Sequence, residues 1–205
     1  MIVNVGGRTD IVNYYTPWLM NRMNEGYVYS RNPLFPKNVS RIDLAPDKVD
    51  CMMFCSKNYR PILQHMGMIN QQYRIICHYT ITAYGRDVEP NVPSIDESVK
   101  TLIELSKIVG KEKVIWRYDP LLLTQKYTVD TLILTYDFIA GKINQYISRA
   151  IFSFVEMYKR LEYKMPEIIP FTKDDKIYLA KEIGKISKKY GIYVQTCGTD
   201  VNYEE

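Results

Sequence analysis

Histidine, cysteine and long apolar runs are all scarce in this sequence. With two histidines, His65 and His78, in 205 residues, the chain cannot assemble a histidine-rich metal site. Four cysteines are too few to make a chain of this length a secreted disulfide scaffold. The most apolar runs, Val114–Trp116 and Leu121–Leu123, are far shorter than the roughly 18 residues that a membrane span needs. We therefore expect no metal site and no membrane partner.

Targeting signals and strong charge are also missing. The first eight residues contain no basic segment leading into an apolar run, so they read as the first structural element, and we expect a reducing, cytoplasmic location. The net charge of +4 comes without a long block of like charges, which permits an anionic ligand but does not require nucleic acid. The hydrophobic content of 46% excludes disorder and is enough for one sizeable core, so we expect a single domain over residues 1–205.

Two phosphate-binding fingerprints are absent. No Gly-x-Gly-x-x-Gly follows the first expected strand, where Gly6-Gly7-Arg8 stands instead, and no P-loop sequence occurs. A dinucleotide-binding, doubly wound sheet is therefore the weaker interpretation. The alternative is a TIM-like (β/α) barrel of about six or seven strand–helix units, which 205 residues leave incomplete relative to eight full units.

Short β-rich runs alternate with segments of helical periodicity, and this alternation predicts an α/β protein with a parallel sheet. The expected helices have clear end signals: Ser94 and Glu97 form a capping box, and Thr172 precedes a helix that Gly191 ends. The expected strands are Ile2–Gly7, Tyr27–Arg31, Val39–Leu44, Cys51–Cys55, Arg74–Thr82, Val114–Tyr118, Ile147–Val155 and Ile192–Thr196, and the expected helices are Tyr14–Glu25, Ser94–Val109, Val129–Gly141 and Thr172–Lys189. Val39–Leu44 follows a short proline-bearing turn, which favours a hairpin with Tyr27–Arg31.

Polar side chains gather where the expected strands end. In parallel α/β proteins the functional site lies at the carboxyl ends of the strands, so these residues are the candidates. Four cations and two carboxylates would line one pocket, and arginine forks suit phosphate or carboxylate ligands. The cations are Arg8, Arg31, Lys57 and Arg117, and the carboxylates are Asp10 and Asp119.

We expect this pocket to bind a small phosphate- or carboxylate-bearing ligand, with a nucleotide or nucleic-acid component as one option. In an enzyme, Asp10 or Asp119 would act as general base and Lys57 as acid or electrostatic stabiliser. The expected substrate-binding residues are Arg8, Arg31, Asn32, Asn58, Thr82, Arg117 and Ser153.

Plainer interpretations stand beside these. Arg117 with Asp119, and Arg8 with Asp10, would also fit internal ion pairs, because buried charges are normally paired. Lys57 fits a solvated loop charge, and His78 fits a core histidine better than a catalytic base. Cys51 and Cys55 on one strand lie too far apart to share a zinc ion, at roughly 3.3 Å per residue. The 18 tyrosines would suit a base-stacking groove, although a biased genome composition explains them more simply.

Several of these strand-end segments together resemble an uncharacterised bacterial family of domains of unknown function, related in pattern to radical S-adenosylmethionine enzymes and spore photoproduct lyases. The segments are Gly7–Ile11, Arg31–Pro33, Val39–Arg41, Asp50-Cys51, Lys57-Asn58, Thr82–Pro93, Val114–Pro120 and Ser153–Val155, and the resemblance covers residues 1 to about 197. The most specific are Arg117-Tyr-Asp-Pro120 and Glu89-Pro-Asn-Val-Pro93.

The resemblance also bears on cofactors and partners. Longer members of this family carry a cysteine cluster near the C-terminus, which this sequence lacks beyond Cys197. An iron–sulfur cluster and S-adenosylmethionine are thus implied only if a C-terminal extension or a cysteine-bearing partner supplies the cysteines. The alternative function is a non-catalytic protein that binds a ligand or a partner after losing that centre.

Overall fold

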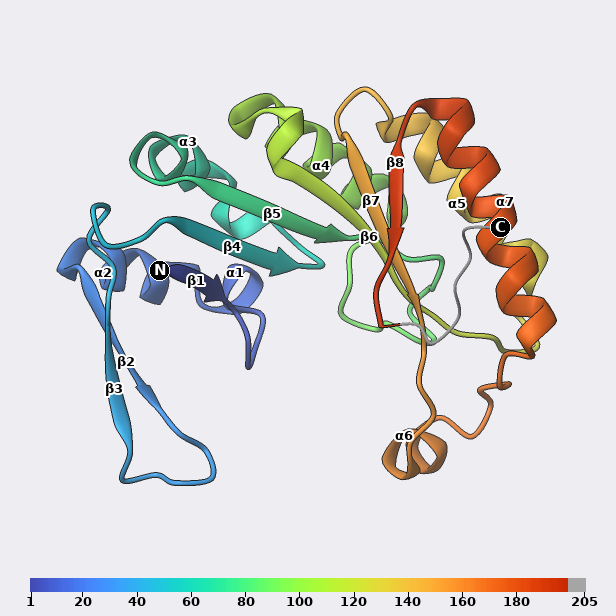
Figure 1. Cartoon of the computed structure of the whole chain (residues 1–205), viewed down its shortest axis with the longest axis horizontal. Helices are drawn as coiled ribbons and strands as arrows, with labels where there is room; N and C mark the ends of the chain where they lie inside the picture. The colour runs from blue at the N-terminus through green and yellow to red at the C-terminus, as the bar shows by residue number, and fades with distance from the viewer. Residues whose placement is uncertain (199–205) are drawn as a thin grey trace.

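The core of the protein is a six-stranded sheet, described here from a computed structural model of residues 1–198 (Figure 1). All neighbouring strands are parallel, and their spatial order follows the chain without a reversal. In order these strands are β1 (Ile2–Val5), β4 (Cys51–Ser56), β5 (Ile75–Thr80), β6 (Val114–Leu121), β7 (Arg149–Phe154) and β8 (Tyr193–Thr196). The predicted mixed α/β fold with a parallel sheet is therefore confirmed.

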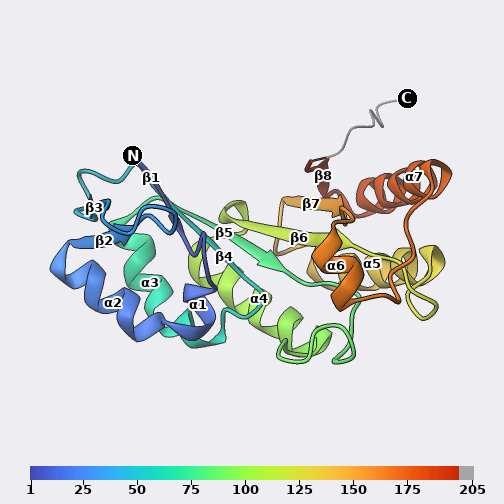
Figure 2. The same cartoon turned by 90° about the horizontal axis from the view of Figure 1, so that it is seen from below.

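Burial alternates along the central strands, because successive side chains point to opposite faces. Met52, Phe54, Trp116 and Phe152 are buried, whereas their sequence neighbours Met53 and Cys55, for example, are partly exposed. The helices α3 (Leu63–Gln72), α4 (Ile95–Val109) and α5 (Val129–Ile143) lie along one side of the sheet, and α7 (Lys173–Tyr190) packs beside α5 (Figure 2). We call the other, partly exposed side the open face.

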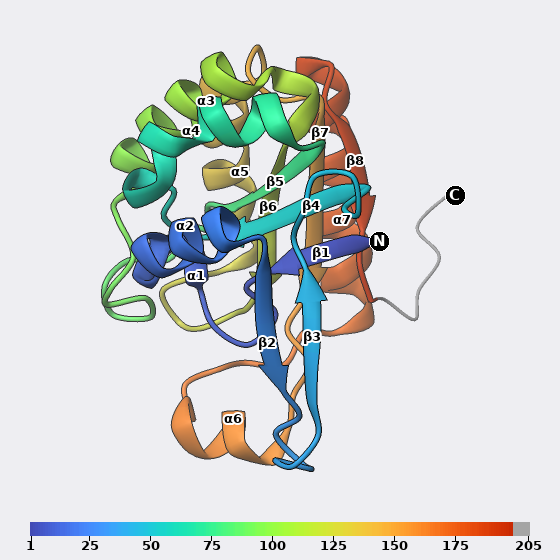
Figure 3. The same cartoon turned by 90° about the vertical axis from the view of Figure 1, so that its left-hand side faces the viewer.

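Two further strands form a separate hairpin that projects from the body of the molecule (Figure 3). β2 (Tyr27–Arg31) and β3 (Val39–Asp43) pair antiparallel, as the short turn between them predicts. The Asn32 side chain stabilises that turn by accepting the backbone N–H groups of Leu34 and Phe35, at 2.9 and 3.2 Å. At the base of the hairpin, Gly26 ends the preceding helix in the left-handed region with φ 77°, which glycine adopts without steric cost.

Both predicted capping boxes are present: Ser94 with Glu97 begins α4, and Thr172 with Asp175 begins α7. The predicted helix over Tyr14–Glu25 is instead two helices, α1 (Ile11–Tyr14) and α2 (Thr16–Glu25), and Pro17 lies in the first turn of the second.

Helices α3 and α6 (Lys159–Lys164) were not predicted. No side chain caps the start of either helix, so neither has a clear start signal. α3 nevertheless buries Leu63, Met66 and Ile69 at helical spacing, whereas α6 has no buried residue. The short turns η1 (Arg60–Ile62) and η2 (Lys111–Lys113) precede α3 and β6. Within residues 1–198, no helix combines the length and the apolar character required to cross a membrane.

An aromatic cluster fixes the covered face of the sheet. The Trp116 ring stacks on Tyr136 of α5 with 4.6 Å between centroids, and Tyr118 contacts both rings. The indole Nε1 of Trp116 donates to the carbonyl oxygen of Ile81 at 3.0 Å, so this buried polar atom is satisfied.

Replacing Trp116 with Phe leaves the Ile81 carbonyl without this donor and leaves a small void. We expect a loss of about 2 kcal/mol in the free energy of unfolding, measured by urea denaturation. Trp18→Phe is the control, since Trp18 is exposed and should change stability by less than about 0.5 kcal/mol. Equal effects of the two substitutions would contradict this assignment of the core.

The four cysteines should react with a thiol reagent in order of exposure. Cys197 is exposed, Cys51 and Cys55 are half-buried, and Cys77 is buried. Burial raises the pKa of the Cys77 thiol to about 12, so it should react only after unfolding. Counting fast and slow thiols with Ellman's reagent, and comparing Cys77→Ser with the native protein, checks this order. A fast-reacting Cys77 would contradict the assignment of its side chain to the covered face.

Candidate anion-binding site at the carboxyl edge of the sheet

Asn32 stabilises the hairpin turn and does not line the cavity at the hairpin. The other predicted site residues form four separate groups in and around the carboxyl edge of the sheet. Two groups lie on β4 and its following loop, one lies on the open face at β6 and β7, and one lies between β1 and the hairpin. Each group has its own partners, and these partners decide which side chains remain available to a ligand.

Asp10 and Asn58 belong to the first group, in which every predicted residue has a local partner. Asp10 caps α1 by accepting the Asn13 N–H at 2.9 Å, and it accepts the buried hydroxyl of Ser56 at 2.7 Å. The Asn58 amide donates to Asn13 Oδ1 at 2.8 Å and accepts the N–H of Arg60 at 3.0 Å. These bonds join the loops after β1 and β4.

Lys57 forms the second group with Glu89 and Thr82. Its ammonium pairs with the Glu89 carboxylate, and the hydroxyl of the buried Thr82 donates to the same carboxylate at 2.8 Å. Lys57 therefore is not a freely solvated loop charge. Glu89 comes from the Thr82–Pro93 segment, and no spacing rule in the sequence identified it as this partner.

Arg117, Asp119 and Ser153 form the third group, on the open face. Arg117 pairs with Asp119, which also accepts the hydroxyl of Ser153, and the guanidinium donates to Cys55 Sγ at 3.6 Å. Burial lowers the pKa of Arg117, but the nearby Asp119 and Cys55 outweigh this, and the net shift is upward. The ion-pair interpretation of Arg117 with Asp119 is thus confirmed. The two side chains can meet because β6 continues to Leu121 and carries both residues on one face.

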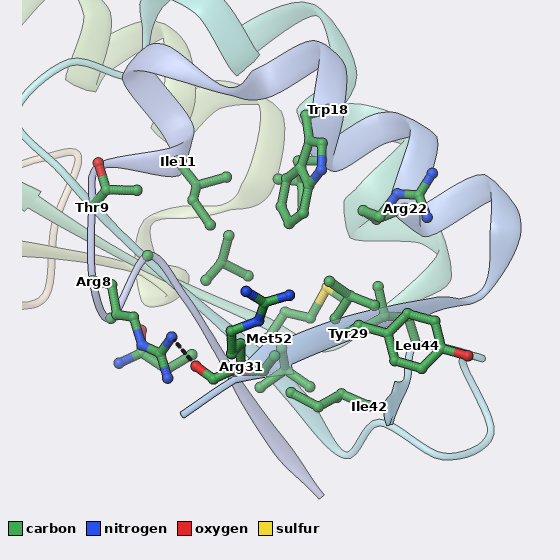
Figure 4. A pocket seen from close by; sticks show the side chains of 18 residues that line it. Arg8, Thr9, Ile11, Trp18, Arg22, Tyr29, Arg31, Ile42, Leu44 and Met52 are labelled. Carbon is green, nitrogen blue, oxygen red and sulfur yellow. Dashed lines mark hydrogen bonds between the residues drawn. The ribbon is translucent and has the colours of Figure 1, made fainter. Parts of the chain in front are cut away.

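Arg8 and Arg31 form the fourth group, in a cavity of about 330 Å³ between β1, α2 and the hairpin (Figure 4). The guanidinium of Arg8 donates to the backbone carbonyl oxygen of Arg31. A third arginine, Arg22, also lines the cavity, but its guanidinium is paired with Glu25 at 2.7 Å. Among the described residues that line this cavity, none is an aspartate or a glutamate.

The rest of the cavity is largely apolar. Trp18 and Ile11 lie across from Arg8 and Arg31, and Leu44 and Met52 complete the inner wall (Figure 4). The loop that enters from β1 turns at Gly6, with φ 110°, where an added Cβ would lie 3.0 Å from the Thr9 carbonyl oxygen. A glycine at this position is what lets the chain place Arg8 beside the hairpin.

The sequence predicted one pocket with four cations, and the structure separates them. Arg8 and Arg31 share a cavity, while Lys57 and Arg117 lie in other groups, each beside its own carboxylate. Within residues 1–198, no ion pair joins Arg8 to Asp10. Sequence reasoning missed Trp18 and Tyr29, which also line the cavity, because both lie away from the ends of the sheet strands.

The cysteines do not fit an iron–sulfur cluster in this part of the chain. Cys51 and Cys55 lie at opposite ends of β4, and Cys77 points to the covered face. Among the described residues, no three His, Cys, Asp or Glu side chains come close enough together to hold a metal ion. We therefore assign no chemistry to such a centre here.

His78 provides a test of the electrostatics of the open face. Burial lowers its pKa below the usual 6.5, and the cations Arg117 and Arg149 lower it further, against an opposing effect of Asp119. The unfolded chain thus takes up a proton at His78 before the folded protein does, so folding stability falls as the pH drops below about 6.5. We expect His78→Gln to reduce the loss of unfolding free energy between pH 7 and pH 5, measured by urea denaturation.

His65→Gln is the matched control for removal of one imidazole. If His78→Gln and the native protein lose stability in parallel over this pH range, the electrostatic description of the open face is wrong.

Comparison with known proteins identifies a family but no activity. A search of curated proteins found no match. The family described as Domain of unknown function (DUF1848) matches residues 2–205, which confirms the resemblance to an uncharacterised family. Nothing in the comparisons supports a relationship to radical S-adenosylmethionine enzymes or spore photoproduct lyases. With a match that spans nearly the whole chain, the protein belongs to the DUF1848 family.

Proposed function

We propose that this protein binds an organic anion, with a phosphate or carboxylate group, in the cavity between β1, α2 and the hairpin. One observation carries the proposal: Arg8 and Arg31 reach this cavity together, and its described lining contains no carboxylate to neutralise them. Two guanidinium groups without acidic neighbours are a favourable environment for a negatively charged ligand.

The other predicted cations support this choice by contrast. Lys57 is paired with Glu89, and Arg117 is paired with Asp119, so an anion would have to displace a carboxylate at either position. At Arg8 the guanidinium donates to a neutral carbonyl, and its remaining N–H groups can bind a ligand. An anion therefore gains more binding free energy at Arg8 and Arg31 than at Lys57 or Arg117.

The apolar wall of the cavity indicates the chemical character of the rest of the ligand. Trp18 presents an aromatic ring, and Ile11, Leu44 and Met52 add aliphatic surface beside it. A volume of about 330 Å³ lies within the range of small-molecule sites. We infer a ligand with an anionic end and a flat or apolar body, such as a nucleoside phosphate.

We also infer that the sheet is an incomplete (β/α) barrel. The strand order follows the chain order, which is the arrangement of a singly wound barrel, whereas a doubly wound sheet reverses its order at a switch point. Helices that cover one face support the same inference. The open face then corresponds to the barrel interior.

The proposal concerns binding and does not depend on turnover. Asp10, Lys57 and Asp119 stay predicted acid–base residues, each with a hydrogen-bonded or ionic partner. A non-catalytic protein that binds a ligand or a partner would use the same cavity.

Tryptophan emission provides a direct test, because Trp18 lines the cavity while Trp116 is buried in the core. We expect adenosine 5′-monophosphate to change the emission and to bind more tightly than either adenosine or inorganic phosphate alone. Arg8→Gln and Arg31→Gln should each weaken binding by about 10-fold or more, since each removes charged hydrogen bonds to the anion. Isothermal titration calorimetry gives the affinities independently.

Arg60→Gln is the control, because it removes one exposed positive charge that is paired with Glu104 elsewhere on the surface. Binding that is unaffected by both cavity substitutions, or no binding of adenosine 5′-monophosphate, pyrophosphate and benzoate, would refute the proposal.

A further inference from the structure

One face of the β2–β3 hairpin interleaves aromatic and cationic side chains. Tyr27, Tyr29 and Arg31 alternate along β2, so they lie on the same face. The antiparallel register places Arg41 opposite Tyr29, Val39 opposite Arg31 and, at the base of the hairpin, Asp43 opposite Tyr27, on that face as well. The opposite face carries Val28 and Ile42, which pack against the hydrophobic core. We call the outer set Tyr27, Tyr29, Arg31, Val39 and Arg41 the aromatic–arginine face.

The contacts within this face leave the Tyr29 ring available to a ligand. Tyr27 and Tyr29 meet edge to face with 5.5 Å between centroids, and the Arg41 guanidinium lies 4.6 Å from the centroid of the Tyr27 ring. Tyr29 itself is 62% exposed. The Tyr29 ring therefore keeps apolar surface in water that a stacked ligand ring could cover.

Positive charge dominates the outer part of the hairpin. From Arg31 to Arg41 the sequence contains Arg31, Lys37 and Arg41 and no carboxylate, whereas Asp43 lies opposite Tyr27 at the base of the hairpin and accepts the backbone N–H of Ala45 at 3.0 Å. At the tip, Leu34 and Phe35 are exposed as well. The hairpin projects away from the sheet, so these groups can contact a large partner without obstruction by the body (Figures 1 and 3).

The hairpin is also continuous with the proposed anion site. Tyr29, Ser30 and Arg31 line the cavity, and Arg8 is hydrogen-bonded to the carbonyl of Arg31 at the end of β2. A partner that follows the aromatic–arginine face therefore reaches the cavity at one end.

From these observations we infer that the hairpin binds single-stranded nucleic acid, with one nucleotide of the strand in the cavity. Phosphates would pair with Arg31, Arg41 and Lys37, and an unpaired base would stack on Tyr29. A duplex fits less well, because its bases are already stacked and cannot cover an exposed tyrosine ring. Occupation of the cavity by a nucleotide rests on the proposed function, whereas binding along the hairpin has its own evidence.

The probe is a fluorescently labelled oligothymidylate of 20 nucleotides, titrated by fluorescence anisotropy at several salt concentrations. We expect the logarithm of the binding constant to fall linearly with the logarithm of the salt concentration. Tyr29→Ala should weaken binding by about 10-fold through loss of stacking. Arg41→Gln should weaken binding and make the salt slope shallower by about 0.7, the value for one phosphate contact to a single strand.

Lys188→Gln is the matched control, because it removes one exposed charge from the end of α7. It should leave the affinity nearly unchanged. Circular dichroism of each variant establishes that the fold is retained.

Three outcomes would overturn the inference: no binding of the oligonucleotide, equal effects of Arg41→Gln and Lys188→Gln, or equally tight binding of a 20-base-pair duplex. Tighter binding to vesicles of phosphatidylglycerol, or to polyglutamate, than to the oligonucleotide would assign the hairpin to a membrane or to an acidic protein instead.

Failure of this inference can be distinguished from failure of the proposed function. Arg41 does not line the cavity, so Arg41→Gln should weaken the binding of the oligonucleotide and leave the binding of adenosine 5′-monophosphate unchanged. Mononucleotide binding without oligonucleotide binding refutes the hairpin inference alone. Oligonucleotide binding that depends on Arg41 but not on Arg8 refutes occupation of the cavity by a nucleotide of the strand and supports binding along the hairpin.

Discussion

Packing of one face of the parallel sheet against helices determines which side chains of the central strands are buried and which reach the open face. The interlocked rings of Trp116, Tyr118 and Tyr136 hold that face closed, and the strict alternation of side chains then sends Cys55, Arg117 and Ser153 to the open face. Residues past the strand ends escape this alternation. Their positions depend on loop hydrogen bonds, and these bonds separate the four groups of site residues.

The distribution of carboxylates then decides which cations are available. Glu89 and Asp119 each neutralise a neighbour, and both are largely shielded from solvent, so these pairs hold strands and loops together. Arg8 and Arg31 lie outside this network and face an apolar wall. The same sheet thus has ion pairs near its middle and, at its β1 edge, a cavity whose described lining contains arginines and no carboxylate.

The sequence predicted the parts of the fold that local rules control. Capping at Ser94 and Thr172, the hairpin after Tyr27 and the parallel sheet all follow from short-range patterns. The partners of Lys57 and the cavity beside Arg8 depend on contacts between distant segments, such as Lys57 with Glu89. A single sequence shows which residues end the strands but not which loops meet, so it merged four groups into one pocket.

The hydrogen bond from Arg8 to the Arg31 carbonyl gives one side chain two competing roles. It fastens the end of β2 next to the hairpin turn to the β1 loop, and the side chain also lines the cavity. A ligand that draws the guanidinium away from the carbonyl must therefore also change the free energy of hairpin orientation. By thermodynamic reciprocity, a partner that reoriented the hairpin would then change the affinity of the cavity for that ligand by the same factor by which the ligand changes the affinity of the hairpin for the partner.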